Sequence, residues 1–594
     1  MLGNSQTKVI TSSIHQVFDS AKDVTRGLPS DMSLSRLFFV SAALSAVAHA
    51  IFTIDDSVCA SKAANCRTYD GVGGLSGGGA TSVLLPFYEE SVRSDILHFL
   101  FKPSFGAALP ILKVEIGGDA QSTDGAESSH MHTPYEEDYH RGYEWWLMVE
   151  AKKRNPDIKL YGLSWAFPQW VTCTPGTLSN CTGQNPYAWP EQLAAYTTKW
   201  ISGAKNTYGL DIDYIGSWNE RGFDSTYLKT LRATLDANGF SKTKIVASDS
   251  GWDPISTDIL NDPELAAAVH TVGCHYPGTS SSASAEKTGK PLWASEDDST
   301  YDNDIGAECF ARIISRNYVL GNMTATINWN LVSAYMKGTN WYRAGLMNAL
   351  SPWSGAYGSQ TADGAFTAGP MIWAAAHTTQ FTKPGWSYLP VGTGAGTGAG
   401  LLANGGTYLT IADWTSGKTG AAADYTIVIE KMSSEHSSCV RPYLQPYPSG
   451  PEVATFKLTG HLASIKTLNV WYTHWAYAAE DKTVEFERRA PIAVAADGTF
   501  SLNITVDSIY TLTTRTDGAK GVPSAPVAKP FLFPATWTDS FESCAESSEA
   551  AYWADQNGAW ECKNSGDPTH GIVMQQQVPL KPVTWGGDIR VTRS

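Results

Sequence analysis

The chain carries few charges and no excess of basic ones. Only 17% of its 594 residues are charged, and 58 acidic against 43 basic side chains give a formal net charge of −15. A surface of this sign does not attract phosphate groups, so we expect neither nucleic acid nor an anionic membrane as a partner. The hydrophobic residues, 42% of the total, suffice for a large core, and the length predicts two or three domains.

Long hydrophobic runs are also missing. The most apolar stretch, "MSLSRLFFVSAALSAVAHA" (residues 32–50), has a polar start with Arg36 and ends in the small-x-small pattern "AHA". This is typical of a secretory signal peptide that begins at an internal Met, so that residues 1–31 form an upstream extension or a mis-called start. An uncleaved anchor is the alternative, but the apolar run is shorter than the ~20 residues of a membrane span. We therefore expect a soluble, lumenal protein with no transmembrane anchor.

Motifs for phosphate, dinucleotide or metal binding are absent as well. The glycine-rich stretch "GVGGLSGGGA" (71–80) lacks the Lys-Ser/Thr of a phosphate loop, and its glycine spacing does not match a dinucleotide site. We interpret it as a loop whose backbone passes close to a ligand or to another loop. His130 and His132 in "SHMH" lack a third ligand, and such pairs more often make hydrogen bonds within a loop. We expect no catalytic metal and no cofactor.

Nine cysteines and three glycosylation sequons fit an oxidising secretory compartment. Three cysteine pairs are close enough in sequence for local loops, two further cysteines would need a long-range bridge, and one is left over, although spacing alone does not establish pairing. The local pairs are Cys59/Cys66, Cys173/Cys181 and Cys544/Cys562, the long-range bridge would join Cys309 and Cys439, and Cys274 is left over. The sequons are at Asn180, Asn322 and Asn503.

Between residues 69 and 381 the chain alternates short β-like runs with longer amphipathic ones. Eight strands with intervening helices over this length predict a (β/α)8 barrel, and a doubly wound open sheet is the alternative. The expected strands are "TYDGVGG" (68–74), "ILKVEIGG" (111–118), "KLYGLSWAF" (159–167), "IDYIGSWNE" (212–220), "KIVASDS" (244–250), "HTVGCHYP" (270–277), "PLWASED" (291–297) and "TATINWN" (324–330).

Past residue 384 the helical pattern stops. Strand-like runs at 406–414, 424–432, 453–461, 467–475 and 509–516 are separated by Gly, Ser and Asp turns, which predicts a β-sandwich. A Pro-rich linker follows, and a further β-domain begins after it. The expected organisation is a barrel at 67–382, a sandwich at 51–66 and 383–516, a linker at 517–535 and the last domain at 536–594.

Two strand ends of the expected barrel carry glutamates. "WNE" ends the fourth strand with Glu220, and "WASED" ends the seventh with Glu296. Functional groups of such barrels lie at the carboxyl ends of the strands, and a retaining glycosidase needs two carboxyl groups there, about 5–5.5 Å apart. A lone Asn-Glu pair is more often solvated or ion-paired, and Asp297 and Asp298 leave the nucleophile within "SEDD" open. For Glu220 to act as the acid, we expect its pKa to be raised by burial and by the other carboxylate.

Long motifs also resemble a known family. "YDGVGGLSGGGATS", "KVEIGGDAQSTDG", "DIDYIGSWNER", "HYPGT", "WASED" and "AHTTQFTKPGW" are similar to those of the galactocerebrosidases, lysosomal galactosylceramidases that hydrolyse galactosylceramide and galactosylsphingosine with retention. The resemblance covers about residues 69–585. It implies a (β/α)8 barrel, a β-sandwich and a lectin-like domain, a lysosomal location, and a saposin-type carrier that presents the glycosphingolipid substrate.

Carried over to this chain, the resemblance implies Glu220 as proton donor and Glu296 as nucleophile. It also implies a disulfide between Cys309 and Cys439 that joins the barrel to the sandwich. The residues that it implies as sugar contacts are Thr123, Trp165, Asn219, Arg441 and Trp585.

Three features depart from the family pattern. The loop 173–181 is longer than expected, Trp341 stands where a Tyr near the sugar is expected, and the lectin-like domain stops shortly after Trp585. Two other functions stay open, and the truncated lectin-like domain favours only the second. One is a different β-glycosidase on the same barrel, glucosylceramidase-like or acting on soluble galactosides. The other is a non-catalytic glycolipid-binding protein.

Overall fold

A computed structural model describes eight stretches of the chain that together form one compact unit. They are residues 51–60, 66–79, 81–333, 344–349, 366–392, 397–415, 422–527 and 536–586. The expected extension and signal peptide (1–50) and Trp341 lie outside these residues.

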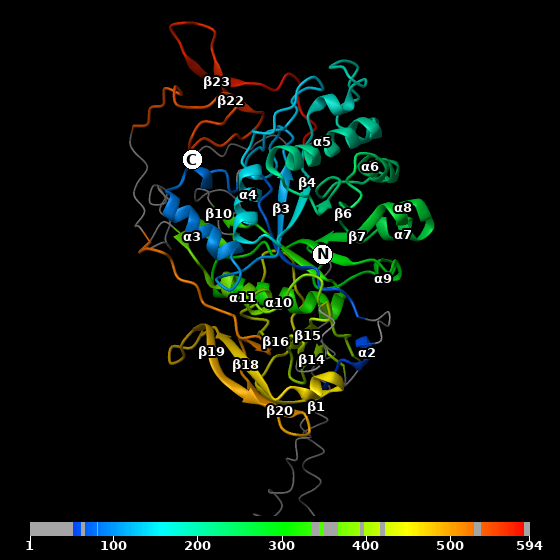
Figure 1. The fold of residues 1–594 in the computed structure, drawn as a ribbon, viewed down its shortest axis with the longest axis vertical. Helices are drawn as coiled ribbons and strands as arrows, with labels where there is room; N and C mark the ends of the chain where they lie inside the picture. Colours follow the sequence, from blue (N-terminus) through cyan, green and yellow to red (C-terminus); the bar gives the residue numbers. More distant parts are fainter. Residues whose placement is uncertain are drawn as a thin grey trace, which may run out of the picture. The chain divides into compact units, whose positions relative to one another are not determined.

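Eight parallel strands close into a barrel, which confirms the predicted fold class (Figure 1). The first strand pairs with the last in register from Gly71–Ala325 to Leu75–Trp329, so the sheet has no free edge and the open-sheet alternative is wrong. Each strand falls on one of the eight predicted runs: β2 (Gly71–Leu75), β3 (Ile111–Ile116), β4 (Lys159–Ser164), β5 (Tyr214–Ile215), β6 (Lys244–Ser250), β7 (Val269–His275), β8 (Leu292–Asp297) and β9 (Ala325–Trp329).

Helices surround the barrel and bury their apolar faces against its strands. Local chemistry sets their ends: α5 has Pro190 at its first position, where the missing N–H is not needed, and stops at Gly209, whose φ of +70° suits a left-handed cap. These helices are α3 (Glu90–Phe101), α4 (Glu144–Arg154), α5 (Pro190–Tyr208), α6 (Ser225–Ala237), α7 (Ile255–Asn261), α8 (Pro263–Ala268), α9 (Ala283–Lys287), α10 (Asp304–Gly321) and α11 (Pro370–Thr379). The short helix α2 (Ser57–Ala60) belongs to the sandwich, in whose core Cys59 is buried.

Two further sheets form the β-sandwich. A three-stranded sheet (β1-β17-β20) and a seven-stranded one (β13-β15-β16-β21-β18-β19, with β14 on β15) share one apolar core that includes Phe52, Tyr408 and Phe456. β1 reaches this sheet from the N-terminal side and pairs in parallel with β17. The strands are β1 (Ile51–Asp55), β13 (Ser387–Tyr388), β14 (Gly400–Leu401), β15 (Thr407–Ala412), β16 (Tyr425–Lys431), β17 (Glu452–Thr459), β18 (Thr467–His474), β19 (Val484–Ala493), β20 (Thr499–Ile504) and β21 (Ser508–Thr513).

The five predicted sandwich strands correspond to β15, β16, β17, β18 and β21, but β19 and β20 were not predicted. β19 reads "VEFERRAPIA", and most of its side chains are exposed. A strand at the border of its sheet that faces solvent on both sides has no apolar alternation to reveal it.

Helix α10 joins barrel and sandwich. Nearly all of its residues are buried, because it packs against α11 and β9 on one side and β15 and β16 on the other. Arg316 donates from Nε to Glu430 Oε1 at 2.8 Å, and Cys309 is bonded to Cys439. The three local pairs, Cys59–Cys66, Cys173–Cys181 and Cys544–Cys562, are bonded too, and Cys274 is a buried free thiol.

The segment after the sandwich returns to the barrel. Residues 517–527 have no regular structure, and Ala519 exchanges hydrogen bonds with the side chain of Gln380. Beyond residue 535, β22 (Trp560–Asn564) and β23 (Ile572–Gln576) form a small antiparallel sheet. His132 lies between Asp119 and Glu561, with Nδ1–Oδ2 and Nε2–Oε1 distances of 2.9 and 2.8 Å, so this predicted loop histidine anchors β22 to the barrel.

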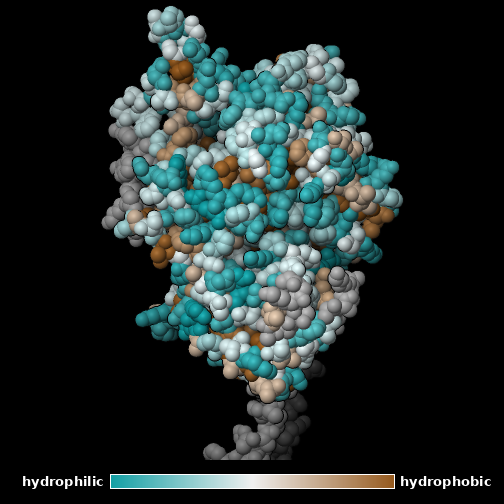
Figure 2. All heavy atoms as spheres, viewed as in Figure 1, coloured by the Kyte–Doolittle hydropathy of each residue, from teal (hydrophilic) through white to brown (hydrophobic). Residues whose placement is uncertain are grey.

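Figure 2 shows a largely hydrophilic surface with small, scattered apolar spots over this face of the molecule. Single exposed apolar side chains of this kind are normal for a folded protein.

Among the helices of the described residues, none combines the length and apolar character of a membrane span. A further small sheet has three strands: β10 (Val332–Ser333), β11 (Met347–Ala349) and β12 (Phe366–Thr367).

Candidate active site

The closure of the barrel brings Glu220 and Glu296 together. Glu296 lies in β8, and Glu220 follows β5 on the short segment that leaves the barrel at its carboxyl end. One carboxylate oxygen of each lies within 4.8 Å of the other. Retaining glycosidases hold their two carboxyl groups about 5–5.5 Å apart, whereas inverting enzymes keep them about 6.5–9.5 Å apart. The pair fits the retaining arrangement.

A tight turn and two cationic groups hold Glu220. Its φ is +48°, and its backbone N–H donates to the carbonyl of Asp249 at 2.9 Å, so the turn after β5 is tied to β6. Arg441 donates from Nη2 to Oε1 at 3.0 Å, and His275 Nδ1 lies 3.6 Å from the same oxygen. The carboxylate thus lies at the mouth of the barrel next to the Arg441 guanidinium and the His275 ring.

This environment overturns the expectation of a raised pKa for Glu220. Burial does raise it, but the contact with His275 and the charges of His275 and Arg441 outweigh burial and lower the pKa to about 2. The pKa of Glu296 is raised instead, first by burial and then by the charge of Glu220. In the unliganded site Glu220 is therefore held in its ionised form.

Glu296 is held by the residues that follow β7. Tyr276 donates from its hydroxyl to Glu296 Oε1 at 3.0 Å and also contacts Ser299 Oγ at 2.6 Å. Its backbone N–H donates to the carbonyl of Glu296 at 2.8 Å, and His275 Nδ1 lies 3.5 Å from Glu296 Oε2.

Of the three acids in "SEDD", only Glu296 faces Glu220. Asp297 accepts from Asn317 Nδ2 at 2.9 Å and from the next backbone N–H, and burial raises its pKa to about 7. Asp298 accepts from Asn328 Nδ2 at 2.8 Å. Both aspartates are buried among structural partners, so the geometry points to Glu296 as the carboxylate available to a ligand.

A second buried network lies under the pair. Asp249 in β6 accepts from the Tyr161 hydroxyl at 2.6 Å and lies 3.3 Å from Lys113 Nζ and 3.4 Å from His275 Nε2. Burial raises the pKa of Asp249, but Lys113, His275 and Tyr161 outweigh it and lower the pKa to about 2. An ionised carboxylate therefore faces one nitrogen of the His275 ring, while Glu220 and Glu296 face the other.

Asn219 and Trp585 lie directly beside Glu220. The Asn219 N–H donates to the carbonyl of Ser164 at 2.9 Å, and its own carbonyl accepts from Trp585 Nε1 at 2.9 Å. Within the described residues, Asn219 Oδ1 is buried and makes no hydrogen bond. The Arg221 guanidinium lies 5.1 Å from the Trp585 ring centroid and donates to the Trp585 carbonyl. Trp585 thus forms a wall of the site, and Asn219 retains a free acceptor.

Trp165 and Thr123 lie on neighbouring loops. Trp165 directly follows β4, is buried, and packs in the cluster that fills the barrel, against which Trp585 also packs. Thr123 belongs to the loop after β3 and is half-buried. Among the described residues, no hydrogen bond joins its side chain to Glu220 or Glu296. The same loop reaches the C-terminal segment, because Gln121 Oε1 would lie 3.8 Å from a Cβ on Gly586.

The glycine-rich stretch after β2 packs against this loop, as one reading of its sequence predicted. The N–H groups of Gly78 and Gly79 donate to Glu115 Oε2 at 3.0 and 2.9 Å, and Ser122 Oγ donates to the same oxygen at 2.9 Å. Gly79 has φ +85°, and a Cβ there would lie 2.3 Å from the carbonyl oxygen of Gly125. Only glycine fits where the two loops cross.

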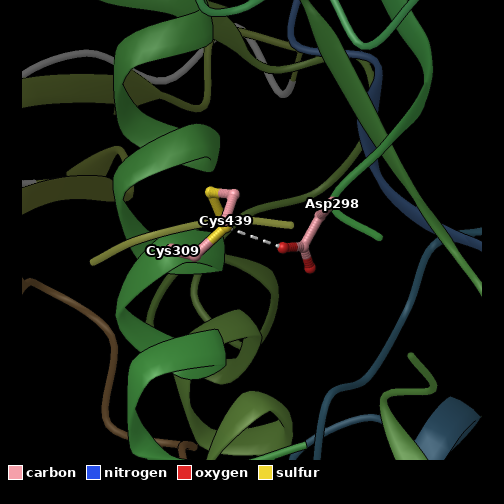
Figure 3. Close-up of side chains that lie close together, drawn as sticks. All are labelled: Asp298, Cys309 and Cys439. Carbon is pink, nitrogen blue, oxygen red and sulfur yellow. Dashed lines mark hydrogen bonds between the residues drawn. A yellow bond between two sulfur atoms is a disulfide. The ribbon is translucent and has the colours of Figure 1, made fainter. Parts of the chain in front are cut away.

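Arg441 comes from the sandwich side and is fixed by its neighbours. Its N–H donates to the carbonyl of Ser299 at 2.9 Å, and its guanidinium stacks 3.6 Å from the Tyr276 ring centroid. Two residues earlier, Cys439 is bonded to Cys309 on α10, where Asp298 Oδ1 lies 3.1 Å from Cys309 Sγ (Figure 3). A disulfide sulfur has no proton, and burial raises the pKa of Asp298 well above its usual value, so the carboxylic acid is the donor in this contact.

An open polar groove of about 680 Å³ leads away from Glu220 over the loops after β5 and β6. It gives Glu220 a path to solvent. Its lining includes Glu220, Arg221, Phe223, Asp224, Ser248, Ser250, Asp253 and Asp258.

Two clusters of the described residues bring three metal-binding side chains within 4.8 Å of one another. In the first, Asp298 with Cys309 and Cys439, both sulfurs are used in the disulfide (Figure 3). The second consists of Glu220, Glu296 and the histidine between them. A divalent cation there would be repelled by the Arg441 guanidinium, 3.0 Å from Glu220.

Four residues of the site were not predicted from the sequence: Lys113, Asp249, His275 and Tyr276. Each lies in a barrel strand or at its carboxyl end, and "HYP" at the end of β7 contains two of them. The strand-end position is the signal that could have found His275 and Tyr276. Trp329, at the end of β9, packs in the same cluster as Trp165.

The three sequons stay predictions. Asn180 and Asn503 are exposed, whereas Asn322 is half-buried at the end of α10, and its side-chain amide donates to Glu286 Oε1 at 3.2 Å.

Comparison with known proteins agrees with this geometry. Residues 69–380 match the family model of glycosyl hydrolase family 59, and residues 395–519 match that of its central domain. A galactocerebrosidase of Salmo salar is 47% identical over 533 residues, which is 89% of this chain and 75% of that protein. The galactocerebrosidase of Homo sapiens is 45% identical over 535 residues, 89% of this chain and 73% of that protein.

The chain belongs to glycosyl hydrolase family 59. It is therefore a glycoside hydrolase, which makes the carboxyl pair at the barrel mouth the candidate for its chemistry. A putative galactocerebrosidase of Caenorhabditis elegans is also similar, with 33% identity over 84% of this chain and 69% of that protein.

Solved structures with little sequence similarity share the fold of this family 59 chain. The catalytic domain of a GH30 xylanase from Talaromyces cellulolyticus matches with a TM-score of 0.54 and 17% identity, over 78% of this chain and all of that domain. A conserved exported protein of Bacteroides fragilis matches with a TM-score of 0.54 and 16% identity, over the same shares of the two chains.

Proposed function

We propose that this family 59 enzyme is a retaining β-galactosidase that hydrolyses galactosylceramide and galactosylsphingosine to galactose and the free lipid. The observation that carries the proposal is the placing of Glu220 and Glu296 within 4.8 Å at the ends of β5 and β8. The substrate rests on the relatives, which are named galactocerebrosidases and are up to 47% identical over most of this chain.

The reaction proceeds by two displacements. In the first, a Glu296 oxygen forms a bond to galactose C1, the bond from C1 to the lipid oxygen breaks, and Glu220 gives that oxygen its proton. In the second, Glu220 takes a proton from water, whose oxygen bonds to C1 as the bond to Glu296 breaks. Both steps invert C1, so β-galactose is released with retention.

The surrounding residues would bind the sugar. Asn219 Oδ1, buried and free of hydrogen bonds among the described residues, is placed to accept from the 2-hydroxyl, a bond that strengthens in the oxocarbenium-like transition state. Trp165 and Trp585 offer flat faces to the ring. Arg441 and Thr123 are the proposed polar contacts of the remaining hydroxyls.

The lipid would leave through the open groove beside Glu220. Because ceramide is too apolar to enter such a polar groove from water, we expect a saposin-type lipid carrier to present it. The acidic, disulfide-bonded chain suits a lysosomal enzyme that arrives by the secretory pathway.

The test uses galactosylceramide and glucosylceramide in mixed micelles at acidic pH, and NMR of the released sugar. We expect galactose to be released faster than glucose, with the β-anomer appearing first. Glu220→Gln should lower turnover of the lipid substrate about 10²- to 10⁴-fold, the usual contribution of an acid-base group. Glu296→Gln should lower it about 10⁴- to 10⁶-fold, as loss of a covalent nucleophile does.

Asp297→Asn is the control for Glu296→Gln, because Asp297 is also buried and lies next in the chain but faces Asn317 instead of Glu220. A 2-fluoro-galactosyl fluoride should label Glu296 and leave Asp297 and Asp298 unmodified in peptide mass spectra. First release of α-galactose, or a label on Asp297, would refute the mechanism, and preferred release of glucose would refute the substrate. Binding of galactosylceramide without turnover would identify a binding protein instead.

A further inference from the structure

His275 stands between the two proposed catalytic carboxylates. Its Nδ1 lies 3.6 Å from Glu220 Oε1 and 3.5 Å from Glu296 Oε2, and its side chain is 2% exposed. Neither ring nitrogen makes a hydrogen bond with a partner in the described part of the chain. A buried imidazole next to three carboxylates, with its nitrogens loosely held, is an unusual placement for a histidine that only packs.

The other side of the ring determines which proton can move. Nε2 lies 3.4 Å from Asp249 Oδ1, and Asp249 is fixed by the Tyr161 hydroxyl and by Lys113. The ionised Asp249 favours a hydrogen on Nε2, so Nδ1 is the nitrogen that gains or loses its proton. That nitrogen is the one facing Glu220 and Glu296.

The two carboxylates alone do not account for the source of the proton that the acid step needs. The acid step needs a proton on Glu220, yet the Arg441 ion pair and His275 keep Glu220 ionised in the unliganded site. The proton must therefore be held nearby until the sugar binds.

We propose that His275 holds the proton that Glu220 delivers to the leaving group, and that it does so as a positioning residue shared by both carboxylates. The proposal rests on the function proposed above. In the resting site the proton is on His275 Nδ1, with Glu220 and Glu296 ionised. When the substrate is bound, the Nδ1–H bond breaks and a bond from the proton to Glu220 Oε1 forms. The transfer moves one proton and leaves Glu296 ionised for attack.

The charges around His275 favour its protonated form on balance. Burial and Lys113 lower its pKa, whereas Glu296, Asp249 and Glu220 raise it, and the net shift is upward. The titratable and charged groups that face it or lie next to it come from six strands or strand ends: Lys113 (β3), Tyr161 (β4), Glu220 (after β5), Asp249 (β6), Cys274 and Tyr276 (β7 and its end), and Glu296 and Asp297 (β8).

The test compares kcat/KM against pH for an alkyl β-galactoside, whose leaving group needs a proton, and for 2,4-dinitrophenyl β-galactoside, whose leaving group does not. In the wild type we expect activity on the alkyl galactoside to fall on the alkaline side with the temperature dependence of an imidazole ionisation. In His275→Gln this alkaline limb should move at least about one unit to lower pH, because it would then report a carboxyl group, whose ordinary pKa of about 4.3 lies below the value of about 6.5 of an imidazole.

Two controls separate this role from a structural one. His270→Gln changes a histidine on the same strand outside the cluster and should leave the pH profile unchanged. In His275→Gln the profile for the dinitrophenyl galactoside should keep its shape, whereas a merely distorted site would lower both substrates alike.

The temperature dependence of the alkaline limb in the wild type tests the role of His275 even if His275→Gln does not fold. An alkaline limb that hardly moves with temperature is that of a carboxyl group and would overturn the proposal. So would a folded His275→Gln variant with an unshifted limb. If the wild type releases β-galactose with retention in these cases, the proposed function stands and only the role of His275 is lost. A wild type that hydrolyses no galactoside overturns both.

Discussion

At the scale of single residues, the two glutamates are ordinary carboxylates made unequal by their neighbours. Arg441 reaches Glu220 from a segment 221 positions away in the chain, and Tyr276 reaches Glu296 from 20 positions away. A pKa depends on the groups within a few ångströms, so these contacts decide the chemistry more than the local sequence does.

Tyr276 should set the acid side of the pH profile. Its hydroxyl lowers the pKa of Glu296, against the larger effect of burial, by donating to the charged form. Tyr276→Phe removes that bond and should raise the pKa of Glu296 by about 1–2 units, the equivalent of a hydrogen bond to a charged group. Since ionised Glu296 is the proposed nucleophile, the acid limb of kcat should move to higher pH. Tyr135→Phe, at an exposed tyrosine, is the control, and an unmoved acid limb would contradict the role of Tyr276.

Asn219 should act mainly in the transition state. Removing its free amide oxygen with Asn219→Ala should lower kcat about tenfold to a hundredfold and change KM little, because a bond of 1.5–3 kcal/mol to the developing charge is lost. The check uses a 2-deoxygalactoside, on which wild type and variant should react at similar rates. An equal loss on both substrates would show that Asn219 only supports the fold.

At the scale of elements, α10 and the loop 439–443 form one unit through the bond between Cys309 and Cys439. This disulfide closes a span of 130 residues and holds the sandwich loop that carries Arg441 against the barrel. Helix α10 also begins a few residues after Glu296, so both proposed catalytic carboxylates depend on its placement.

Removal of this disulfide should affect stability and substrate binding together. The double variant Cys309→Ser/Cys439→Ser should lose about 2–4 kcal/mol of unfolding free energy and raise KM, because Arg441 is held less firmly. The matched variant is Cys173→Ser/Cys181→Ser, whose span is only 8 residues and should cost less, with no change in KM. Thermal unfolding measures the loss of stability, and assays on mixed micelles measure KM. Equal effects of the two pairs would contradict the coupling of α10 to Arg441.

At the scale of the whole molecule, the C-terminal segment is joined to the barrel through buried acids. Ala126 donates from its backbone to the carbonyl of Asp555 at 2.7 Å, and Glu127 next to it is buried with no hydrogen-bond partner for Oε2 among the described residues. Burial, and then the charges of Glu144 and Glu549, raise the pKa of Glu127 well above its usual value. Glu549 itself has a pKa raised to about 8 by burial.

The protein should therefore be more stable at acidic than at neutral pH. Above the unfolded pKa of about 4.3, the folded state keeps a proton on Glu127 that the unfolded state loses, so stability falls as pH rises, by at most about 1.4 kcal/mol per unit for this group. Glu127→Gln keeps the acceptor for the N–H of Tyr143 and removes the titration. In this variant the unfolding temperature should fall less steeply between pH 4.5 and 8 than it does in the wild type. Glu480→Gln, at an exposed site, should not change the slope, and a slope unchanged in Glu127→Gln would contradict the prediction.

The strands of the barrel could be predicted because each is a short apolar run that repeats between amphipathic helices. The same local signal failed for β19, whose charged side chains face solvent. It found β5 but overestimated its length, because this strand has only two residues. Periodicity reports burial of a face, and it says little where a strand is exposed or very short.

The eight-stranded barrel, the following β-strands and the two glutamates at strand ends could be predicted from the amino-acid sequence, because they depend on patterns within a few residues. The family resemblance implied that Arg441 and Trp585 belong to the same site, and both contact the segment 219–221. The position of His275 between Glu220 and Glu296, and the ionised state of Glu220, came only from the three-dimensional structure. The reason is physical: the ends of β5, β7 and β8 and two distant segments meet only when the barrel closes, and electrostatic effects depend on separation in space.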